Sequence, residues 1–284
     1  MIAPVVLFFI VFAYIPMYGI FMAFYDYIPA LGFAGSEFVG LDNFKLFLDS
    51  AFLGRVVYNT FMLNVYDILF GFPMPILFAL LMFEIASKKL TKTVQFVLYL
   101  PYFISLVVVC GLIKEFLDVN GLINNLFALF GAERQNYLNN SKYYFAIYIL
   151  SNVWQTMGFS SIIYFGALCG INTELFEAAK IDGANRMVIL LRITLPSILP
   201  TIIIMFILRM GGVFNVGFEK SYLLMTTSNK VRSEVVSTYI YERGLGRGGN
   251  WGYGTAVGLL NALVNFGVLF ITNKLASKTG YSLW

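Results

Sequence analysis

Long apolar runs are the feature of this sequence that most constrains its fold. A transmembrane helix needs about 20 consecutive, predominantly apolar residues, and runs of this kind recur along the chain. They occupy residues 2–25, 58–83, 94–113, 143–170, 197–217 and 253–273. Only 12% of the residues are charged, against about 25% in a typical soluble domain. We therefore predict an all-α membrane protein with six transmembrane helices.

The segments between the apolar runs are short, so residues 1–284 are predicted to form a single transmembrane domain. No such segment is long enough to bury a hydrophobic core of its own. The first run, 2–25, lacks the basic region and the small-residue cleavage site of a signal peptide. It is therefore interpreted as a retained span. Because no basic leader precedes it, we expect the natural start of the protein to lie upstream.

The distribution of lysine and arginine predicts the orientation in the membrane, because cytoplasmic loops are enriched in these residues. Their density is higher in 84–93, 171–196 and 274–284 than in 26–57, 114–142 and 218–252. We therefore place the first set of segments, and with it both termini, in the cytoplasm.

The sequence shows no arrangement of residues typical of a catalytic site. The chain contains no histidine, the commonest metal ligand and general base. Cys110 and Cys169 lie in apolar runs and are interpreted as small buried hydrophobic residues. The glycines of 244–249 have the spacing of a phosphate-binding loop, but Asn250 and Trp251 stand where that loop needs Lys and Ser or Thr. We predict that the chain is not an enzyme and binds no metal, and that 244–249 is a flexible turn.

Two charged residues lie inside predicted membrane helices, where charge is costly and often marks a functional position. Asp67 is in the second apolar run and Arg209 is in the fifth. They could form an ion pair, or each could face a water-filled path. Gly254 and Gly258 form a G-x-x-x-G pattern at the start of the last run, which favours close helix packing within the chain or against a partner.

One polar, helix-compatible segment, INTELFEAAKIDGANRMVILLRITLP, separates the fourth and fifth runs at 171–196. A connection between neighbouring helices needs only about 2–8 residues. Asn172 and Thr173 supply an N-cap, and Gly183 supplies a stop or bend. The small side chains favour a helix seated in a groove of another protein over a helix resting on lipid, which would carry larger ones. Its apolar side is expected to consist of Phe176, Ala179, Ile181 and Ala184.

The spacing within this segment resembles the EAA loop of binding-protein-dependent, ATP-driven importers. The family pattern is E-A-A, three residues, G, nine residues and I-x-L-P. The chain matches it with Glu177-Ala178-Ala179, with Gly183 and with Ile193-Thr194-Leu195-Pro196. Similarity to the oligosaccharide and polysaccharide branch, close to lipoprotein-type sugar permeases, also runs through 39–47, 58–81, 93–105, 211–224 and 282–284. The chain thus resembles a permease of the type I, maltose-permease-like superfamily of ABC importers.

The resemblance implies a transmembrane permease subunit of a bacterial cytoplasmic (inner) membrane importer, paired with a second permease subunit in a heterodimer. A cytoplasmic coupling helix between spans four and five would contact one of two ATPase subunits. ATP and magnesium would bind those ATPases, and an extracytoplasmic solute-binding protein would deliver an oligosaccharide; no nucleic acid is involved. The ATPase-coupling residues would be Glu177, Ala178, Ala179, Asp182, Gly183 and Ala184.

Sugar-binding sites combine aromatic faces with polar hydrogen-bonding groups, which suggests candidates for a substrate path on and near the fourth and fifth runs. They are Asn152, Trp154, Gln155, Arg209, Asn215 and Glu219. Arg209 is unusual for the path of a neutral sugar. The last outer loop adds five basic residues, Lys220, Lys230, Arg232, Arg243 and Arg247. Together they favour an acidic saccharide such as an alginate or other uronate oligomer.

The alternative function is secondary transport of a small solute. Inverted repeats and paired intramembrane carboxylates would favour that class, and the sequence shows neither.

Overall fold

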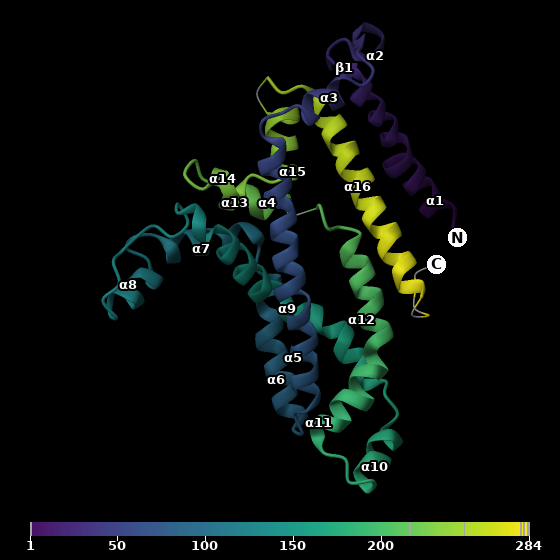
Figure 1. The fold of residues 1–284 in the computed structure, drawn as a ribbon, viewed down its shortest axis with the longest axis vertical. Helices are drawn as coiled ribbons and strands as arrows, with labels where there is room; N and C mark the ends of the chain where they lie inside the picture. The colour runs from purple at the N-terminus through teal and green to yellow at the C-terminus, as the bar shows by residue number, and fades with distance from the viewer. Residues whose placement is uncertain (1, 216, 247, 279, 281, 283–284) are drawn as a thin grey trace.

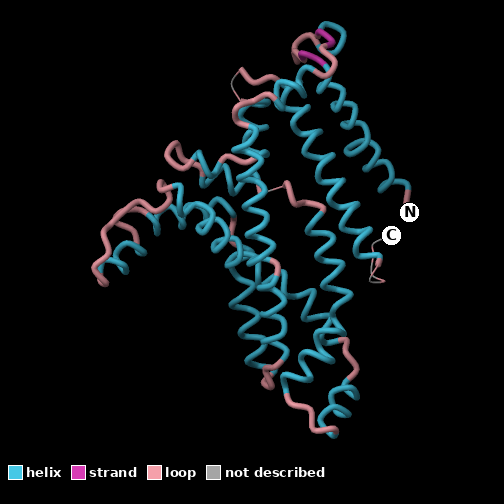
Figure 2. Tube along the Cα trace, in the orientation of Figure 1, coloured by secondary structure: helices cyan, strands magenta, loops and turns pink. Residues whose placement is uncertain are grey.

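The computed structural model is an elongated helical bundle, with the 171–196 segment at one end and a short strand pair at the other (Figure 1). It describes residues 2–215, 217–246, 248–278, 280 and 282. Helix accounts for most of the chain, and loops are short (Figure 2). Among the described residues, four helices are long and apolar enough to cross a membrane, and two bent helix pairs bring the number up to six if each is one span. Val216, Arg247 and the closing Leu283 and Trp284, all mentioned above, lie outside the described residues.

The first and last spans lie side by side at one edge of the bundle (Figure 1). The first span consists of α1 (Ala3–Phe9), the π-helical turn η1 (Ile10–Tyr14) and the 3₁₀ segment η2 (Ile15–Phe24). The last span is α16 (Trp251–Ser277), which Asn250 caps by accepting a hydrogen bond from the Tyr253 amide at 2.8 Å. The start of α1 and the end of α16 both lie away from the strand pair.

The second span is a continuous helix of 31 residues. It consists of α4 (Leu53–Tyr66), the π-helical turn η3 (Asp67–Gly71) and α5 (Pro73–Phe83), so it begins before the predicted residue 58. Its lower half, α5, packs along α9 (Tyr144–Cys169), the fourth span. Ala79 of α5 belongs to the same buried cluster as residues of α9 and of the fifth span. These three spans therefore form the centre of the bundle.

The third predicted span, 94–113, is wrong as one straight helix. α6 (Lys88–Tyr99) and the 3₁₀ turn η4 (Leu100–Phe103) run in one direction, and α7 (Leu106–Leu117) with α8 (Leu122–Ala128) continues at 93° to it. Pro101 is the second residue of the 3₁₀ turn, and Ile104 after the turn is extended. Apolar composition indicates that a segment is buried in lipid or protein, but it does not indicate where the backbone turns. The apolar run alone therefore did not predict the break at Ile104.

The fifth span also differs from its predicted bounds of 197–217. The helix begins at Arg186 and ends at Met210, as α11 (Arg186–Ile189), the π-helical turn η6 (Leu190–Thr194) and α12 (Leu195–Met210). Pro196 and Pro200 therefore lie inside a continuous helix. Hydropathy placed the start too late because arginine side chains can extend from a helix to the polar membrane surface.

The outer segments fold into short elements that pack on the ends of the spans. Near the first span, β1 (Tyr25–Asp26) pairs antiparallel with β2 (Glu37–Phe38), and α2 (Gly32–Gly35) and α3 (Asp42–Leu48) flank it. The 3₁₀ turn η5 (Ser141–Tyr143) leads into α9. After the fifth span come α13 (Phe218–Leu224), α14 (Lys230–Ser233), α15 (Val236–Ile240) and the π-helical turn η7 (Tyr241–Leu245). The small strand pair is a minor departure from the predicted all-α fold.

Glycines allow two helices to meet closely at the outer end. A Cβ atom on Gly254 would lie 2.7 Å from the Cα atom of Gly244. The predicted G-x-x-x-G packing therefore occurs within this chain, between α16 and η7. In the 244–249 segment, Gly244 and Gly249 are close-packed, because a Cβ on Gly249 would lie 2.6 Å from the Gly244 carbonyl oxygen, whereas a Cβ on Gly248 would meet nothing within 4 Å. Cys110 is buried as predicted, but Cys169, the last residue of α9, is exposed.

Candidate functional site

A polar cavity of about 380 Å³ lies where the second, fourth and fifth spans meet the turn that follows Met210. Its walls come from α4, η3, η4, α7, α9, α12 and α13. The polar side chains that line it are Asn64, Asp67, Tyr102, Tyr148, Asn152, Gln155, Thr156, Arg209, Asn215 and Lys220. The cavity thus brings together residues from distant parts of the sequence.

Asp67 and Arg209 form an ion pair inside this cavity. Asp67 is only 5% exposed and accepts a further hydrogen bond from Asn152 Nδ2 at 2.9 Å. The π-helical turn that begins at Asp67 ends at Gly71, where a Cβ atom would lie 2.7 Å from Asp67 Oδ1. Turns of this kind occur frequently at functional sites. The sequence left open whether Asp67 and Arg209 form an ion pair or each face a water-filled path. The structure shows the ion pair.

A second cavity, of about 640 Å³, adjoins the first on the side of the 171–196 segment. The Asp67–Arg209 pair borders both cavities, as does Tyr102. The Tyr102 ring stacks on Phe159 with centroids 4.0 Å apart and planes 4° apart. An ion pair and an aromatic stack therefore lie between a polar cavity and a second cavity that is mostly apolar.

The structure brings together four of the six residues predicted for a substrate path. Asn152, Gln155, Arg209 and Asn215 all line the first cavity. Trp154 and Glu219 border neither cavity. Trp154 is exposed on α9 and Glu219 is exposed at the start of α13.

Sequence reasoning missed other residues that line the cavity, and helical spacing could have found one of them. Tyr148, Asn152 and Gln155 stand at positions i, i+4 and i+7 of α9, which share one helix face, and all three line the cavity. Trp154 lies off this face. Tyr102 and Lys220 carry no such signal, because η4 and α13 reach the cavity only through the tertiary fold.

Asn215 is fixed by two asparagines of the last span. Its Oδ1 atom accepts hydrogen bonds from Asn261 Nδ2 at 3.0 Å and from Asn265 Nδ2 at 3.3 Å. Asn265 Oδ1 in turn accepts from the Phe214 amide at 2.8 Å. The turn after Met210 is therefore tied to α16, which holds one wall of the cavity in place.

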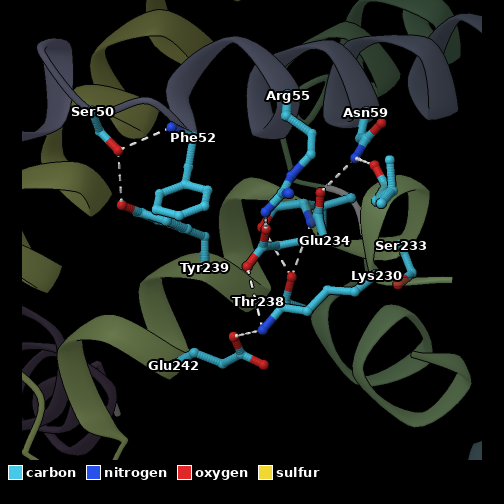
Figure 3. A network of polar contacts seen from close by, with 12 residues as sticks. Ser50, Phe52, Arg55, Asn59, Lys230, Ser233, Glu234, Thr238, Tyr239 and Glu242 are labelled. Carbon is cyan, nitrogen blue, oxygen red and sulfur yellow. Dashed lines mark hydrogen bonds and ion pairs between the residues drawn. The ribbon is translucent and has the colours of Figure 1, made fainter. Parts of the chain in front are cut away.

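A network of charged side chains anchors the outer segment to α4 (Figure 3). Arg55 of α4 forms an ion pair with Glu234, which is only 4% exposed. Lys230 Nζ lies 2.6 Å from Glu242 Oε2 and 3.6 Å from Glu234 Oε1. These pairs hold α14 and η7 against the outer end of the second span.

Two buried asparagines fix the backbone of the same segment. Asn59 Nδ2 donates to the Val231 carbonyl at 2.9 Å. Asn229 Nδ2 donates to the carbonyls of Leu138 and Leu224, both at 3.0 Å. Leu224 is the last residue of α13, so these bonds also fix the helix that carries Lys220.

Most described basic residues of the outer segment are engaged by the protein itself. Lys230 pairs with carboxylates, as described above. The guanidinium groups of Arg232 and Arg243 each lie 5.3 Å from a ring centroid, that of Tyr58 and that of Phe52 respectively. The number of basic residues therefore does not by itself support an acidic substrate, in contrast to the argument made from sequence.

The 171–196 segment contains α10 (Thr173–Ile181), an exposed helix with a cap at each end. Asn172 Oδ1 accepts a hydrogen bond from the Glu174 amide at 3.0 Å, as the sequence predicted. At the other end, Gly183 has a φ of +77°. This left-handed conformation strains residues other than glycine. The glycine of the E-A-A pattern is therefore required by its backbone angle.

The turn at Gly183 is a Schellman motif. The Gly183 amide donates to the Lys180 carbonyl at 3.1 Å, and the Ala184 amide donates to the Ala179 carbonyl at 2.9 Å. Both bonds satisfy carbonyl groups that the helix end would otherwise leave free. The turn directs the chain from α10 back into α11, where Asn185 Oδ1 accepts from the Val188 amide at 2.9 Å.

The apolar side of α10 differs from the prediction at one residue. Phe176, Ala179 and Ala184 are partly buried, and the Phe176 ring lies 6.0 Å from that of Phe83. Ile181 is 86% exposed, so its assignment to this side was wrong. Five residues separate it from Phe176, which places it about 140° around the helix. Ile181 is thus an apolar side chain available to another protein.

One helix connects this exposed segment to the cavity. The helix Arg186–Met210 has 25 residues, a length of about 37 Å. It begins three residues after Gly183 and carries Arg209 near its other end. One helix therefore joins the exposed segment to the Asp67–Arg209 pair. Among the described residues, no group of three or more His, Cys, Asp or Glu side chains is placed to hold a metal ion.

Residues 50–280 match the family described as binding-protein-dependent transport system inner membrane component. The polygalacturonan/rhamnogalacturonan transport system permease protein YteP of Bacillus subtilis (strain 168) is 41% identical over 282 residues, which cover 99% of this chain and 87% of YteP. Protein LplB of the same strain is 37% identical, with 97% of this chain and 86% of LplB covered.

Solved structures show the same architecture. A chain of a bacterial alginate ABC transporter, in complex with its alginate pentasaccharide-bound periplasmic protein, superposes with a TM-score of 0.92 and 39% identity, covering 99% of this chain and 94% of that one. A chain of the MetNI methionine ABC transporter in an inward-facing conformation superposes with a TM-score of 0.58 and 19% identity, covering 80% and 95%. The second likeness concerns the fold alone.

Proposed function

The chain belongs to the family of binding-protein-dependent transport system inner membrane components, and we propose that it forms half of a path for acidic oligosaccharides. It is a permease subunit of a sugar-importing ABC transporter. The observation that carries the proposed mechanism is the helix Arg186–Met210, which joins the exposed 171–196 segment to the cavity. The other half of the path would come from a second permease subunit.

In this proposal α10 is a coupling helix that sits in a cleft of one of two cytoplasmic ATPase subunits. Its side chains are exposed or only partly buried, as expected for a helix that binds another protein. Binding and hydrolysis of ATP, with magnesium, would take place in those subunits. The helix would then transmit their closure to the Asp67–Arg209 pair and open one cavity while the other closes.

The proposed coupling contacts are those named from the sequence, with the geometry now specified. Glu177, Ala178 and Asp182 are exposed and would meet the ATPase directly. Ala179 and Ala184 are partly buried and form the two ends of the hydrogen bond that closes the turn. We add Ile181 because of its exposure.

The substrate class is proposed from the cavity together with the relatives. The cavity is lined by amide, hydroxyl and charged side chains, which suit a sugar rather than an apolar solute. YteP is named for polygalacturonan and rhamnogalacturonan transport, and the solved transporter imports the acidic polysaccharide alginate. Uronate sugars are common to these substrates, so we propose an oligosaccharide of that class.

The proposed location is the bacterial cytoplasmic membrane, with both termini on the cytoplasmic side. The start of α1 and the end of α16 lie away from the strand pair, in the direction of α10 (Figure 1). An extracytoplasmic solute-binding protein would then approach the opposite end, where the strand pair and α13 to α15 lie. Trp154 and Glu219 stay candidates for contacts that another subunit completes.

The proposal is tested by co-expressing the chain with a second permease subunit, the ATPase and the binding protein from the same source. We expect a complex whose ATP hydrolysis rises with binding protein loaded with oligogalacturonate or alginate oligomers. Failure of the ATPase to co-purify would contradict the coupling role. Stimulation by neutral oligosaccharides alone would contradict the substrate class, and uptake driven by an ion gradient without ATP would support secondary transport instead.

A further inference from the structure

Lys220 is a buried cation without an ion-pair partner among the described residues. Its side chain lines the cavity, the residue is only 3% exposed, and its Nζ atom has no hydrogen-bond partner in that part of the chain. The amine lies over the face of Tyr148, whose ring centroid is 5.2 Å away. An ammonium group that has lost its water without gaining an anion is costly, and a single aromatic face compensates only in part.

Arg209, the other cation that lines the cavity, has a counterion. Its charge is offset by Asp67, and the Asp67 carboxylate is also occupied by Asn152. Asp67 is the one carboxylate among the residues that line the described cavity. Glu219, the neighbour of Lys220 in sequence, is exposed and does not line it. The cavity therefore carries one positive charge without a counterion, and that charge is on Lys220.

The helix that carries Lys220 is fixed to the cavity wall. Its helix, α13, is held at its end by the Asn229 side chain, and Leu224 of the same helix belongs to a buried cluster with Tyr148. A Cβ atom on Gly217, just before α13, would lie 3.3 Å from the Tyr148 hydroxyl. The fold thus keeps the amine at the cavity wall.

We propose that Lys220 binds a carboxylate of the transported oligosaccharide, and that it makes the permease prefer acidic over neutral sugars. The inference rests on the proposed function, because it assigns a residue to the substrate class of that same cavity. The ligand carboxylate would supply the missing anion through a charge-assisted hydrogen bond. Asn64, Gln155 and Asn215, which line the same cavity, would then face the sugar hydroxyl groups.

The protonation of Lys220 suits this role. Burial lowers the pKa of the Lys220 amine from 10.5 to about 8, so the group is still mostly charged at neutral pH. An anionic ligand would raise this pKa again, because an opposite charge nearby favours the charged form. Binding of the substrate and retention of the proton therefore support each other.

The test compares two sugars that differ only in charge, in proteoliposomes that hold the complete transporter. One is an oligogalacturonate trimer, and the other is the same trimer with its carboxylates reduced to alcohols. Both are supplied at concentrations that saturate the binding protein, so that a difference in uptake reports the permease. We expect Lys220→Met to lower uptake of the acidic trimer about tenfold, which corresponds to about 1.4 kcal/mol. Uptake of the neutral trimer should stay within twofold.

Lys142→Met is the matched control, because Lys142 is an exposed lysine outside the cavity. It should change neither uptake. Lys220→Arg keeps a cation at the cavity wall and should keep at least part of the preference for the acidic trimer. The inference is overturned if Lys220→Met leaves the preference unchanged, or if it lowers the uptake of both trimers equally while Lys220→Arg restores neither. Absence of all saccharide uptake by the unaltered transporter would instead contradict the proposed function.

Discussion

The 171–196 segment and the cavity are built in opposite ways. The segment is held by hydrogen bonds between residues close in sequence, such as Ala184 to Ala179, and no residue of α10 is fully buried. In the cavity, Asp67 and Arg209 are 142 positions apart in numbering, and Asp67 is buried. In the proposed mechanism, the first region binds another protein through exposed side chains, whereas the second encloses a small ligand.

This difference shows where each region tolerates change. A local turn depends on backbone angles, so one glycine can decide its shape. A buried polar cavity depends on charge balance, since a buried charge that loses its partner is costly. Disturbing the balance should therefore have the larger effect on stability, and disturbing the turn should have the more selective effect on coupling.

The largest effect is expected from removing one half of the cavity ion pair. Arg209→Leu leaves the Asp67 carboxylate buried without its cation, which we expect to destabilise the protein by about 3 kcal/mol, the low end for buried pairs because Arg209 is half exposed. Thermal unfolding of the purified complex measures this loss. The double variant Asp67→Leu/Arg209→Leu should recover most of it. A double variant less stable than the single one would show that charge balance is not what stabilises this site.

The next largest effect is expected at the turn after α10. Gly183→Val forces a β-branched residue into a φ of +77°, at a cost of about 1–3 kcal/mol if the turn is retained. We expect the turn to rearrange and ATP hydrolysis coupled to transport to fall by a factor of about ten or more.

A matched control for this change exists at the outer end of the molecule. Gly131 has a φ of +81°, and the Ala132 amide donates to the Phe127 carbonyl at 3.1 Å in the same type of turn. Gly131→Val imposes similar strain far from α10. It should leave ATP hydrolysis coupled to transport unchanged. Equal loss of coupled ATP hydrolysis in both variants would remove the distinction between the two regions.

A smaller, graded effect is expected from pH. Because burial lowers the pKa of Lys220 to about 8, the amine loses its charge as the pH rises from 7 to 9, whereas sugar carboxylates stay ionised throughout. The preference for the acidic trimer should fall over this range, and Lys220→Met should abolish the pH dependence. A preference that stays constant to pH 9 in the unaltered transporter would contradict the role of this amine.

The groups around Lys220 offer no other explanation for this pH dependence. Cys110 of α7 and Tyr148 of α9 face the amine. The basic residues of α14, Lys230 and Arg232, are held by carboxylates and rings. In α15, Tyr239 shares a hydrogen bond of 2.7 Å with the Tyr253 hydroxyl.

The same pKa shift has a consequence for stability. Above about pH 8 the folded protein no longer binds the Lys220 proton, whereas the unfolded chain keeps it up to the ordinary value of 10.5. The ligand-free protein should therefore gain stability as the pH rises through this window. Lys220→Met should lack this contribution, which thermal unfolding at pH 7 and pH 9 would measure.

The smallest effect is expected at the edge of the cavity. Asn152→Ala removes one hydrogen bond to Asp67, which is worth about 1 kcal/mol and should lower uptake of the acidic trimer about fivefold. Trp154→Ala, on the same helix but outside the cavity, provides the comparison. If the path is confined to the cavity, this variant stays within twofold. A loss as large as that of Asn152→Ala would extend the path to the exposed face of α9.

Much of the architecture could be predicted from the sequence because lipid imposes a simple rule on composition. The second, fourth and last spans lie close to their predicted runs. The break at Ile104 and the early start of the fifth span at Arg186 could not be predicted from hydropathy. The break at Ile104 and the arginine at the start of the fifth span both leave the composition of their segments mostly apolar. Hydropathy therefore does not detect them.

The cavity shows the corresponding limit for function. Asp67 and Arg209 each attracted notice as charges in apolar runs, but two isolated charges do not reveal that they pair. The number of basic residues in the outer loop does not support an acidic substrate, because Lys230 and Arg232 are engaged inside the protein. Lys220 stood out from them only after its surroundings were known.

The sequence by itself determined the membrane class, the caps of α10 and the spacing that identifies the coupling segment. Each of these is a local property, set by residues within a few turns of one another. Only the tertiary structure decided which charges are balanced, because Asp67 meets Arg209 and Lys220 meets no anion through contacts between distant spans. Electrostatic energy in a buried site depends on distances in space and on lost water, and neither quantity is contained in the order of the residues.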